Sequence, residues 1–544
     1  MNKVLEVKNL SVDFLMDSGS FKAVDHVSFD IHKNETFGLV GESGSGKSTI
    51  VKTILRILPA PGVITNGQIL YNKDDILSMD ESSMASLRWK SISIVKQKAL
   101  NSLNPLLKIK NQIMDTIQSH ISISKIDVMS RCNELMDMVG LDQSYLNSFP
   151  HELSGGMRQR VVIAIALALQ PDLIIMDEPT TALDVVSEKE IILKILELKK
   201  KLGFSILFIT HDLELILEFA DRVGVMRYGK LVDVDSSKVI KSGGNHEYSK
   251  KLINSIPRLE AGKDTNKDVM FDPIITVTGL TKIFQKHSSL FSSKGEQVLN
   301  DISFDLNKNE IIGLVGESGS GKSTIAKILT KLLKYEGGRV EFNGVNLSDI
   351  KGKESLLKFR KTIQMVFQDP FASLNSIHTV YSHLSRSILI HRSLSNLSKR
   401  ERKKAIEKEM LSILSEVGLS PPETFIYKFP HEMSGGERQR ISLARALIAN
   451  PQVIIADEPT SMLDMSVRMD ILDLFMKLKK DKKISIIFIT HDIASACYIS
   501  DRIIILKKGK IVDSGPSDEI INNPGHSYSK LLIDSCESGW YTKQ

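Results

Sequence analysis

The sequence has few cysteines and no long hydrophobic segment. Its three cysteines, Cys132, Cys497 and Cys536, lie far apart in 544 residues and form no CxxC pair, which argues against a disulfide framework or a zinc site. The longest apolar run, Val161–Leu169, is about half as long as a segment that crosses a bilayer. The N-terminus lacks the cationic and then apolar regions of a secretory signal. We therefore expect a chain that neither spans a membrane nor is exported.

The chain also has only a small excess of positive over negative charge. The net charge of +6 is small for this length, and charged residues make up an ordinary 25% of the chain. Two lysine-rich stretches, at 197–203 and 477–483, are typical of solvated helix ends. The composition therefore does not indicate a nucleic-acid partner.

What the sequence does contain is one module written twice. The segment GLVGESGSGKSTI stands at 38–50 and again at 313–325. Ser154 precedes Asp177 by 23 residues, and Ser434 precedes Asp457 by 23 residues as well. A chain of this length is too long for one hydrophobic core, and matched spacing indicates two domains of one fold. The other paired segments are Phe149–Arg160 with Phe429–Arg440, Leu173–Asp184 with Val453–Asp464, and Phe208–Asp212 with Phe488–Asp492.

The repeat predicts the domain boundaries. We expect a first domain at residues 1–257, a polar linker at 258–273 and a second domain at 274–544. Each half combines short apolar runs typical of buried strands with helical patterns such as Glu401–Val417. The predicted fold class is α/β, with an α/β core and a helical subdomain in each domain.

The repeated segment contains the pattern G-x-x-x-x-G-K-S, at 41–48 and 316–323. Glycines let several backbone N–H groups point at one anion, and the helix that follows adds its positive end. The lysine of such a loop reaches the β- and γ-phosphates, and the serine binds Mg²⁺. The fold class therefore narrows to tandem P-loop NTPase domains that bind ATP. The predicted loop residues are Gly41, Glu42, Ser43, Gly44, Ser45, Gly46, Lys47, Ser48, Thr49, Gly316, Glu317, Ser318, Gly319, Ser320, Gly321, Lys322, Ser323 and Thr324.

An acidic pair follows an apolar strand in each half. In a nucleotide site, the first carboxylate, Asp177 or Asp457, holds Mg²⁺ through water. The second, Glu178 or Glu458, can polarise the attacking water as a general base. The predicted chemistry is hydrolysis of ATP.

These motifs, together with SGG followed by RQR, resemble the ATP-binding cassette (ABC) ATPases over nearly the whole chain. The triplets are Ser154-Gly155-Gly156 and Ser434-Gly435-Gly436, and each precedes an apolar helical run. A serine hydroxyl and glycine N–H groups at a helix start suit anion binding. The resemblance implies an intramolecular dimer, in which the SGG of one domain completes the ATP site of the other.

The resemblance implies further roles by position. Gln97 and Gln368 are similar to the glutamines that touch Mg²⁺ and the lytic water, and His211 and His491 to the histidines that hold the γ-phosphate. The implied metal-binding residues are Ser48, Gln97, Asp177, Ser323, Gln368 and Asp457.

Two other pairs complete this set. Asp184 and Asp464 resemble the aspartates that contact the partner domain. Phe14 and Phe284 match each other in the repeat and are candidates to stack on adenine, although a core position is an equal alternative and Phe21 is close by.

Other segments are similar to the peptide/nickel importer group: Ser102–Pro105, Phe367–Asn375, His246–Pro257 and His526–Ser535. This similarity implies an ATP-hydrolysing subunit at the cytoplasmic face of the cell membrane. Its partners would be two integral-membrane permease subunits and an extracytoplasmic solute-binding protein, and its cargo peptides, nickel or a metal chelate. The cysteine cluster that often follows the tail in this group is missing, so no iron–sulfur centre is expected.

A different class remains as the alternative, namely a twin-cassette translation or ribosome-associated ATPase without a membrane partner. Such proteins carry a long, charged helical linker and commonly NHLD after DEPT. Here the linker is short and the sequences are TALD and SMLD.

The halves differ at specific positions. Met157 and Glu437 stand where the family usually has Gln. The carboxylate of Glu437 lies near a phosphate-binding helix start and could weaken the closure of the two domains on ATP at that site. Lys96 and Lys98 replace an aromatic residue and an acid of the second half. In ABC transporters the residues beside these glutamines face the membrane partner. The resemblance therefore implies that the halves dock on different permease subunits.

Overall fold

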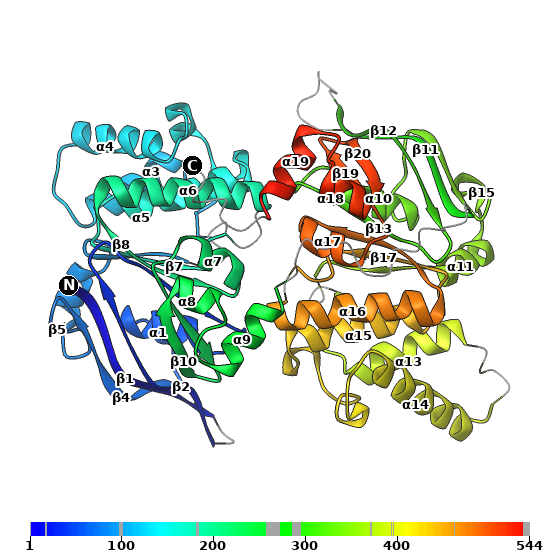
Figure 1. Cartoon of the computed structure of the whole chain (residues 1–544), viewed down its shortest axis with the longest axis horizontal. Coiled ribbons are helices and arrows are strands. Elements are labelled where there is room, and N and C mark those ends of the chain that lie inside the picture. Colours follow the sequence, from blue (N-terminus) through cyan, green and yellow to red (C-terminus); the bar gives the residue numbers. More distant parts are fainter. Residues whose placement is uncertain are drawn as a thin grey trace. The chain divides into compact units, whose positions relative to one another are not determined.

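The computed structural model describes residues 2–16, 19–96, 102–180, 184–256, 272–285, 295–369, 373–392, 394, 397–461 and 463–536. The chain divides into two compact units, one within residues 1–256 and one within residues 257–537 (Figure 1). Of the predicted linker, only Asp272 and Pro273 are among the described residues. The domain boundaries therefore stay a prediction.

The core of unit one is a six-stranded sheet in the order β10-β9-β3-β8-β7-β6. All its neighbours pair in parallel except β9 and β10. Strands β3, β7 and β8 are buried along their whole length, as expected for parallel strands covered on both faces. The strands are β3 (Thr36–Gly41), β6 (Ile92–Val95), β7 (Leu173–Asp177), β8 (Ser205–Thr210), β9 (Arg222–Arg227) and β10 (Lys230–Ser236).

A second, antiparallel sheet of unit one has the order β2-β1-β4-β5. Its apolar side chains, Leu5 and Leu10 among them, share a core with Leu39 on β3 and with Ile50 on helix α1 (Lys47–Ile54). The P-loop helix is therefore packed between the two sheets. The strands are β1 (Lys3–Met16), β2 (Gly19–His32), β4 (Gly62–Tyr71) and β5 (Asp74–Asp75).

A helical subdomain interrupts the core between β6 and β7. It contains α3 (Ile109–Gln118), α4 (Lys125–Met138) and α5 (Gly155–Leu167), which lie together beside the sheet (Figure 1). Short 3-10 helices, η2 (Gln143–Asn147) and η3 (Pro150–Glu152), lead into α5. The remaining helices are α2 (Glu81–Leu87), α6 (Val185–Leu202), α7 (Leu213–Phe219), α8 (Ser237–Lys241) and α9 (Glu247–Asn254).

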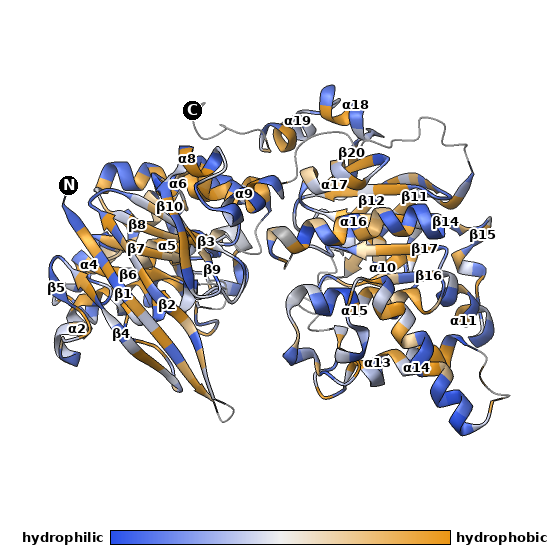
Figure 2. Ribbon diagram, turned by 60° about the horizontal axis from the view of Figure 1, so that its bottom comes forward, coloured by the Kyte–Doolittle hydropathy of each residue, from blue (hydrophilic) through white to orange (hydrophobic). Residues whose placement is uncertain are grey.

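Unit two repeats this plan, with sheets in the orders β16-β17-β18-β13-β19-β20 and β12-β11-β14-β15. In Figure 2 the buried strand β17 is mostly orange, whereas β1 of unit one shows both orange and blue bands. The predicted fold class, with its two α/β domains and helical subdomains, is confirmed.

The elements of unit two are as follows. The strands are β11 (Pro273–Gln285), β12 (Gly295–Asn307), β13 (Ile311–Gly316), β14 (Gly337–Phe342), β15 (Val345–Asn346), β16 (Ile363–Val366), β17 (Val453–Asp457), β18 (Ser485–Thr490), β19 (Arg502–Lys507) and β20 (Lys510–Pro516). The helices are α10 (Lys322–Leu329), α11 (Lys353–Thr362), α13 (Val380–His391), α14 (Lys399–Glu416), α15 (Gly435–Leu447), α16 (Met465–Lys482), α17 (Ile493–Ile499), α18 (Ser517–Asn522) and α19 (Ser527–Asp534), with 3-10 helices η4 (Leu347–Asp349), η5 (Pro422–Thr424) and η6 (Pro430–Glu432).

Within the ranges that the structure describes, no helix is both long enough and apolar enough to cross a membrane.

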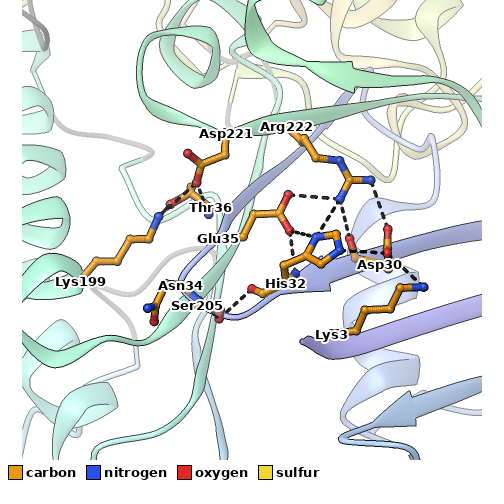
Figure 3. Close-up of polar contacts among 10 residues, drawn as sticks. All are labelled: Lys3, Asp30, His32, Asn34, Glu35, Thr36, Lys199, Ser205, Asp221 and Arg222. Atoms are coloured by element: carbon orange, nitrogen blue, oxygen red, sulfur yellow. Dashed lines mark hydrogen bonds and ion pairs between the residues drawn. The ribbon is translucent and has the colours of Figure 1, made fainter. Parts of the chain in front are cut away.

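A charged network joins the two sheets of unit one (Figure 3). Arg222 on β9 donates to Asp30 Oδ1 at 3.1 Å and to Glu35 Oε1 at 3.2 Å. Glu35, only 7% exposed, also accepts from the backbone N–H of His32 at 2.6 Å. Since Glu35 directly precedes β3, this network fixes the start of the strand whose other end opens into the P-loop. In unit two, Arg502 holds Asp305 and Glu310 in the same way.

Removal of Arg222 should therefore destabilise unit one. Arg222→Ala leaves the buried Glu35 carboxylate without its guanidinium, at an expected loss of about 2–3 kcal/mol in the free energy of unfolding. The measurement is urea unfolding followed by Trp89 fluorescence in a Trp540→Phe background, since the chain has 2 tryptophans. Lys194→Ala, which breaks a pair with the largely exposed Glu197, should cost less than about 0.5 kcal/mol. Equal losses in the two variants would contradict the prediction.

Candidate functional site

The repeated glycine loop leads from β3 into α1 in unit one and from β13 into α10 in unit two. Gly44 and Gly46 have φ angles of 79° and 101°, in the left-handed region that favours glycine. A side chain at Gly46 would place its Cβ 2.4 Å from the carbonyl oxygen of Ala23. Both the conformation and the close approach therefore require glycine at this position.

The loop lysine is buried and folded over the loop backbone. Lys47 Nζ donates to the carbonyl oxygens of Gly41 and Glu42 at 2.7 and 2.8 Å. Lys322 makes the same two contacts, at 2.6 and 2.8 Å, with Gly316 and Glu317. Each lysine is also the first residue of its helix, so its positive charge lies where the helix N-terminus already favours an anion.

Each loop serine lies against the first acidic residue. Ser48 Oγ donates to Asp177 Oδ1 at 3.2 Å, and Ser323 Oγ donates to Asp457 Oδ1 at 3.0 Å. Burial raises the pKa of both aspartates, and the neighbouring Glu178 raises that of Asp177 further. A divalent cation would offset this buried charge, and hydroxyl and carboxylate oxygens are the ligands that Mg²⁺ prefers. These residues therefore fit a bound Mg²⁺.

The second acidic residue has an unusual backbone in both units. Glu178 and Glu458 have φ angles of 48° and 45°, which are uncommon for a residue with a side chain. Their backbone N–H groups donate to the carbonyl oxygens of Ile209 and Ile489, each at 2.9 Å. The adjacent strands β8 and β18 therefore hold this conformation.

The carboxylates of these glutamates meet the predicted histidines. His211 Nδ1 lies 3.2 Å from Glu178 Oε1, and His491 Nδ1 lies 3.5 Å from Glu458 Oε2. Gln368 Nε2 also donates to Glu458 Oε2, at 2.7 Å. Gln97, its predicted counterpart, lies outside the described residues. Unit two therefore unites Gln368, Glu458 and His491 around one carboxylate.

Electrostatics couple the glutamate and the histidine of unit two. Burial opposes charge on both groups, but the hydrogen bond between them prevails. The pKa of Glu458 is consequently lowered from its ordinary value, and the pKa of His491 is raised. The pair therefore favours a carboxylate and an imidazolium.

The two SGG serines are the N-caps of α5 and α15. Ser154 Oγ accepts from Met157 N at 3.3 Å, and Ser434 Oγ accepts from Glu437 N at 3.2 Å. In unit two, Glu437 Oε2 also accepts from the N–H of Ser434 at 2.7 Å, which completes a capping box. The carboxylate of Glu437 is therefore turned back onto its own helix start, and its predicted effect on closure stays a prediction.

The remaining predicted residues lie apart from the loops. Asp184 caps α6 by accepting from the N–H and Oγ of Ser187, at 3.0 and 2.9 Å, and Asp464 precedes α16. Phe14 on β1 is opposite Phe21 on β2. Phe284 is 41% exposed, with Lys282 Nζ 5.0 Å from its ring centroid. The assignment of Phe14 and Phe284 to adenine stays a prediction.

Sequence reasoning does not single out Arg445, whose Nη1 donates to the carbonyl oxygen of Ser373 at 2.8 Å. The only signal in the sequence is a difference between the repeats, because Ile165 occupies this position in the first half.

Comparison with known proteins agrees with this geometry. Residues 24–181 and 299–461 each match the family model described as "ABC transporter", and together they make up more than half of the chain. The chain belongs to the ABC transporter family. It is an ATPase, and its two cassettes bind ATP.

Relatives of this ABC transporter ATPase match it almost from end to end. "Peptidoglycan transport ATP-binding protein YejF" of Agrobacterium fabrum (strain C58 / ATCC 33970) is 37% identical over 97% of this chain and 96% of its own length. "Glutathione import ATP-binding protein GsiA" of Escherichia coli O157:H7 is 36% identical over 97% of this chain and 89% of its own length.

Among solved structures, a dimeric structure of the ATP-binding cassette MJ0796 bound to ADP and Pi is 29% identical to this chain. The match covers 45% of this chain and 98% of that one, with a TM-score of 0.39.

The Glu458–His491 pair of this ATPase predicts a pH dependence of stability. The pKa of His491 is raised above its ordinary 6.5, so the contribution of its charge is fully present below pH 6.5 and is lost as the pH rises through the raised value. The lowered pKa of Glu458 keeps the carboxylate charged above its ordinary 4.5. His491→Gln should therefore lower the melting temperature more at pH 6 than at pH 9, as measured by calorimetry. The control His431→Gln changes an exposed histidine and should have the same small effect at both pH values; the same behaviour of His491→Gln would refute the prediction.

Proposed function

We propose that this chain is the ATP-hydrolysing subunit of an ABC importer that takes up peptides through separate permease subunits. The observation that carries the proposal is the similarity, over 97% of the chain, to relatives named for peptidoglycan transport and glutathione import. Glutathione is a tripeptide, and peptidoglycan contains short peptides, so a peptide cargo is the chemistry that these solutes share. Nickel or a metal chelate is the second cargo to test.

Two composite ATP sites are part of this proposal. The P-loop of each cassette binds the phosphates, and the SGG serine of the other cassette, Ser434 or Ser154, contacts the γ-phosphate. Support comes from the position of both serines at helix starts, where N–H groups and the helix dipole favour an anion. The linker tethers the two cassettes and keeps their effective concentration high.

Hydrolysis depends on the residues around the second acid. Glu178 or Glu458 accepts a proton from the attacking water, and the adjacent histidine orients the carboxylate and contacts the γ-phosphate. The loop lysines, Lys47 and Lys322, leave their backbone partners to bind the phosphates. Ser48 with Asp177, and Ser323 with Asp457, would hold Mg²⁺, which would supply positive charge beside the phosphates. Gln97 and Gln368 would contact the cation and the attacking water.

The partners of the importer would be two integral-membrane permease subunits and an extracytoplasmic solute-binding protein. The chain would then work at the cytoplasmic face of the cell membrane. The relatives do not favour the alternative of a ribosome-associated ATPase.

The glutamates provide the test of this function. In the complex reconstituted with its permeases in proteoliposomes, Glu178→Gln and Glu458→Gln should each lower peptide-stimulated ATP hydrolysis, by about 100-fold at the altered site. Peptide uptake should stall while bound ATP is retained. The readouts are phosphate release and uptake of radiolabelled peptide, with Lys194→Ala as the control variant. Full coupled activity in both variants would refute the two-site scheme, and stimulation by ribosomes instead of peptide-loaded binding protein would refute the importer.

Helices α3 and α13, which follow Gln97 and Gln368 in the chain, carry different surface residues in the two units. In unit two, Tyr381 on α13 stacks on Tyr427, with ring centroids 6.1 Å apart. At the matching places of unit one, Lys110 Nζ donates to Asn147 Oδ1 at 2.9 Å. Tyr427 is 67% exposed, so the aromatic pair is available to a partner. This difference supports the proposal that the cassettes dock on different permease subunits.

Crosslinking tests this asymmetry. A photoreactive amino acid at position 98, outside the described residues, and one at position 369 should each capture a different permease subunit, as identified by mass spectrometry. Tyr381→Lys combined with Tyr427→Asn gives unit two the polar pair of unit one and should lower the yield at position 369 while leaving that at 98 unchanged. Capture of both subunits from both positions would overturn the proposal.

A further inference from the structure

A continuous set of contacts in unit two begins at the proposed general base. Gln368 Nε2 donates to Glu458 Oε2 at 2.7 Å. Five residues further on, the backbone N–H of Ser373 donates to the carbonyl oxygen of Asp369 at 3.1 Å. The glutamine side chain and Ser373 therefore lie at the two ends of one short segment.

Helix α15 holds the far end of this segment at two points. Arg445 Nη1 donates to the carbonyl oxygen of Ser373 at 2.8 Å. Ser442 Oγ lies 3.3 Å from Ser373 Oγ, and Ser442 is only 2% exposed. Burial also lowers the pKa of Arg445, so its hydrogen bond lies in surroundings of low dielectric, where such bonds are strong.

The same helix begins at the serine proposed to contact the γ-phosphate. Ser434 is the N-cap of α15, and Arg445 lies eleven residues along, about 16 Å at the rise of an α-helix. A helix of this kind moves as a rigid element. A displacement of its N-terminus therefore carries Arg445, and with it the end of the segment that contains Gln368.

At the two matching positions of unit one, helix α5 carries apolar side chains. Ile165 and Val162 occupy the places of Arg445 and Ser442 on α5. Neither side chain has a donor for the carbonyl oxygen of Ser102, the counterpart of Ser373. Another contact of the same helix recurs in both units, since Arg160 and Arg440 each donate to a backbone carbonyl oxygen.

We infer that Arg445 is a positioning residue that links helix α15 to the Gln368 segment in the second cassette. The inference rests on the roles proposed above for Ser434, Gln368 and Glu458. It makes the geometry around Glu458 dependent on the position of α15, whereas the two matching positions of α5 carry the apolar side chains of Val162 and Ile165.

The test is amide hydrogen exchange of the purified full-length chain, with and without Mg-ATP, together with its basal ATPase kinetics. Arg445→Ile, which reproduces the residue of unit one, should raise exchange at 365–376 about fivefold or more. It should lower kcat several-fold with KM for ATP within about twofold, because the phosphate loop is untouched. Arg445→Lys, which keeps a hydrogen-bond donor, should show a smaller rise in exchange at 365–376 and a smaller loss of kcat than Arg445→Ile.

Arg440→Ile is the matched control, since Arg440 is on the same helix and also donates to a backbone carbonyl, that of Val417. It should raise exchange near Val417 and leave 365–376 unchanged. If Arg445→Ile does not fold, Ser442→Val, which introduces the residue that unit one has at position 162, should give a smaller increase at the same segment. Unchanged exchange at 365–376, or raised exchange with normal kcat, would overturn the inference. Both readouts need no permease, so a failure of peptide stimulation counts against the importer alone.

Discussion

The parallel register of three strands is the constraint on which each site depends. In unit one, β3 lies between β8 and β9, and β8 pairs in turn with β7. The carboxyl ends of parallel strands meet at one edge of a sheet, and ligands bind in the crevice outside these ends. The P-loop after β3, the acidic pair at the end of β7 and the histidine after β8 are consequently neighbours. A one-residue slip of β7 would reverse which face its side chains point to and would take Asp177 away from Ser48.

The opposite ends of the same strands explain why this register is held so firmly. Glu35 and Asp221 lie at the starts of β3 and β9, and the backbone N–H of Thr36 donates to Asp221 Oδ2 at 2.7 Å. Glu35 is buried, and such a charge is costly to bury unless it is paired and hydrogen-bonded. The observed alignment of the strands gives Glu35 these partners, so the network favours this register. A matching network around Arg502 shows that both cassettes hold the start of the central strand by an arginine and two acidic residues.

Much of this can be predicted from the sequence, for physical reasons. Glycines at a strand end followed by Lys-Ser leave few conformations, and equal spacing in the two halves places the later motifs in one fold. The left-handed backbone of Glu178 and Glu458 lies beyond such reasoning, because a glutamate is an unusual residue for it and β8 or β18 imposes it through a hydrogen bond. The capping box of Glu437 is a second feature that the prediction lacks. The prediction treats this residue only as a charge near an anion site, although Ser followed three residues later by Glu is the known pattern of that motif.

The differences between the cassettes follow one physical theme. Glu437 completes the capping box of α15 and Arg445 holds Ser373, so charged side chains fix this helix of the second cassette at its start and near its end. The first has Met157 and Ile165 at these places, and apolar contacts constrain direction less than hydrogen bonds do. Two cassettes with identical P-loops therefore differ in the side chains that hold the helix beginning at the SGG serine. An enzyme built in this way can hydrolyse ATP by one chemistry at both sites and still respond unequally when its helical subdomains are moved.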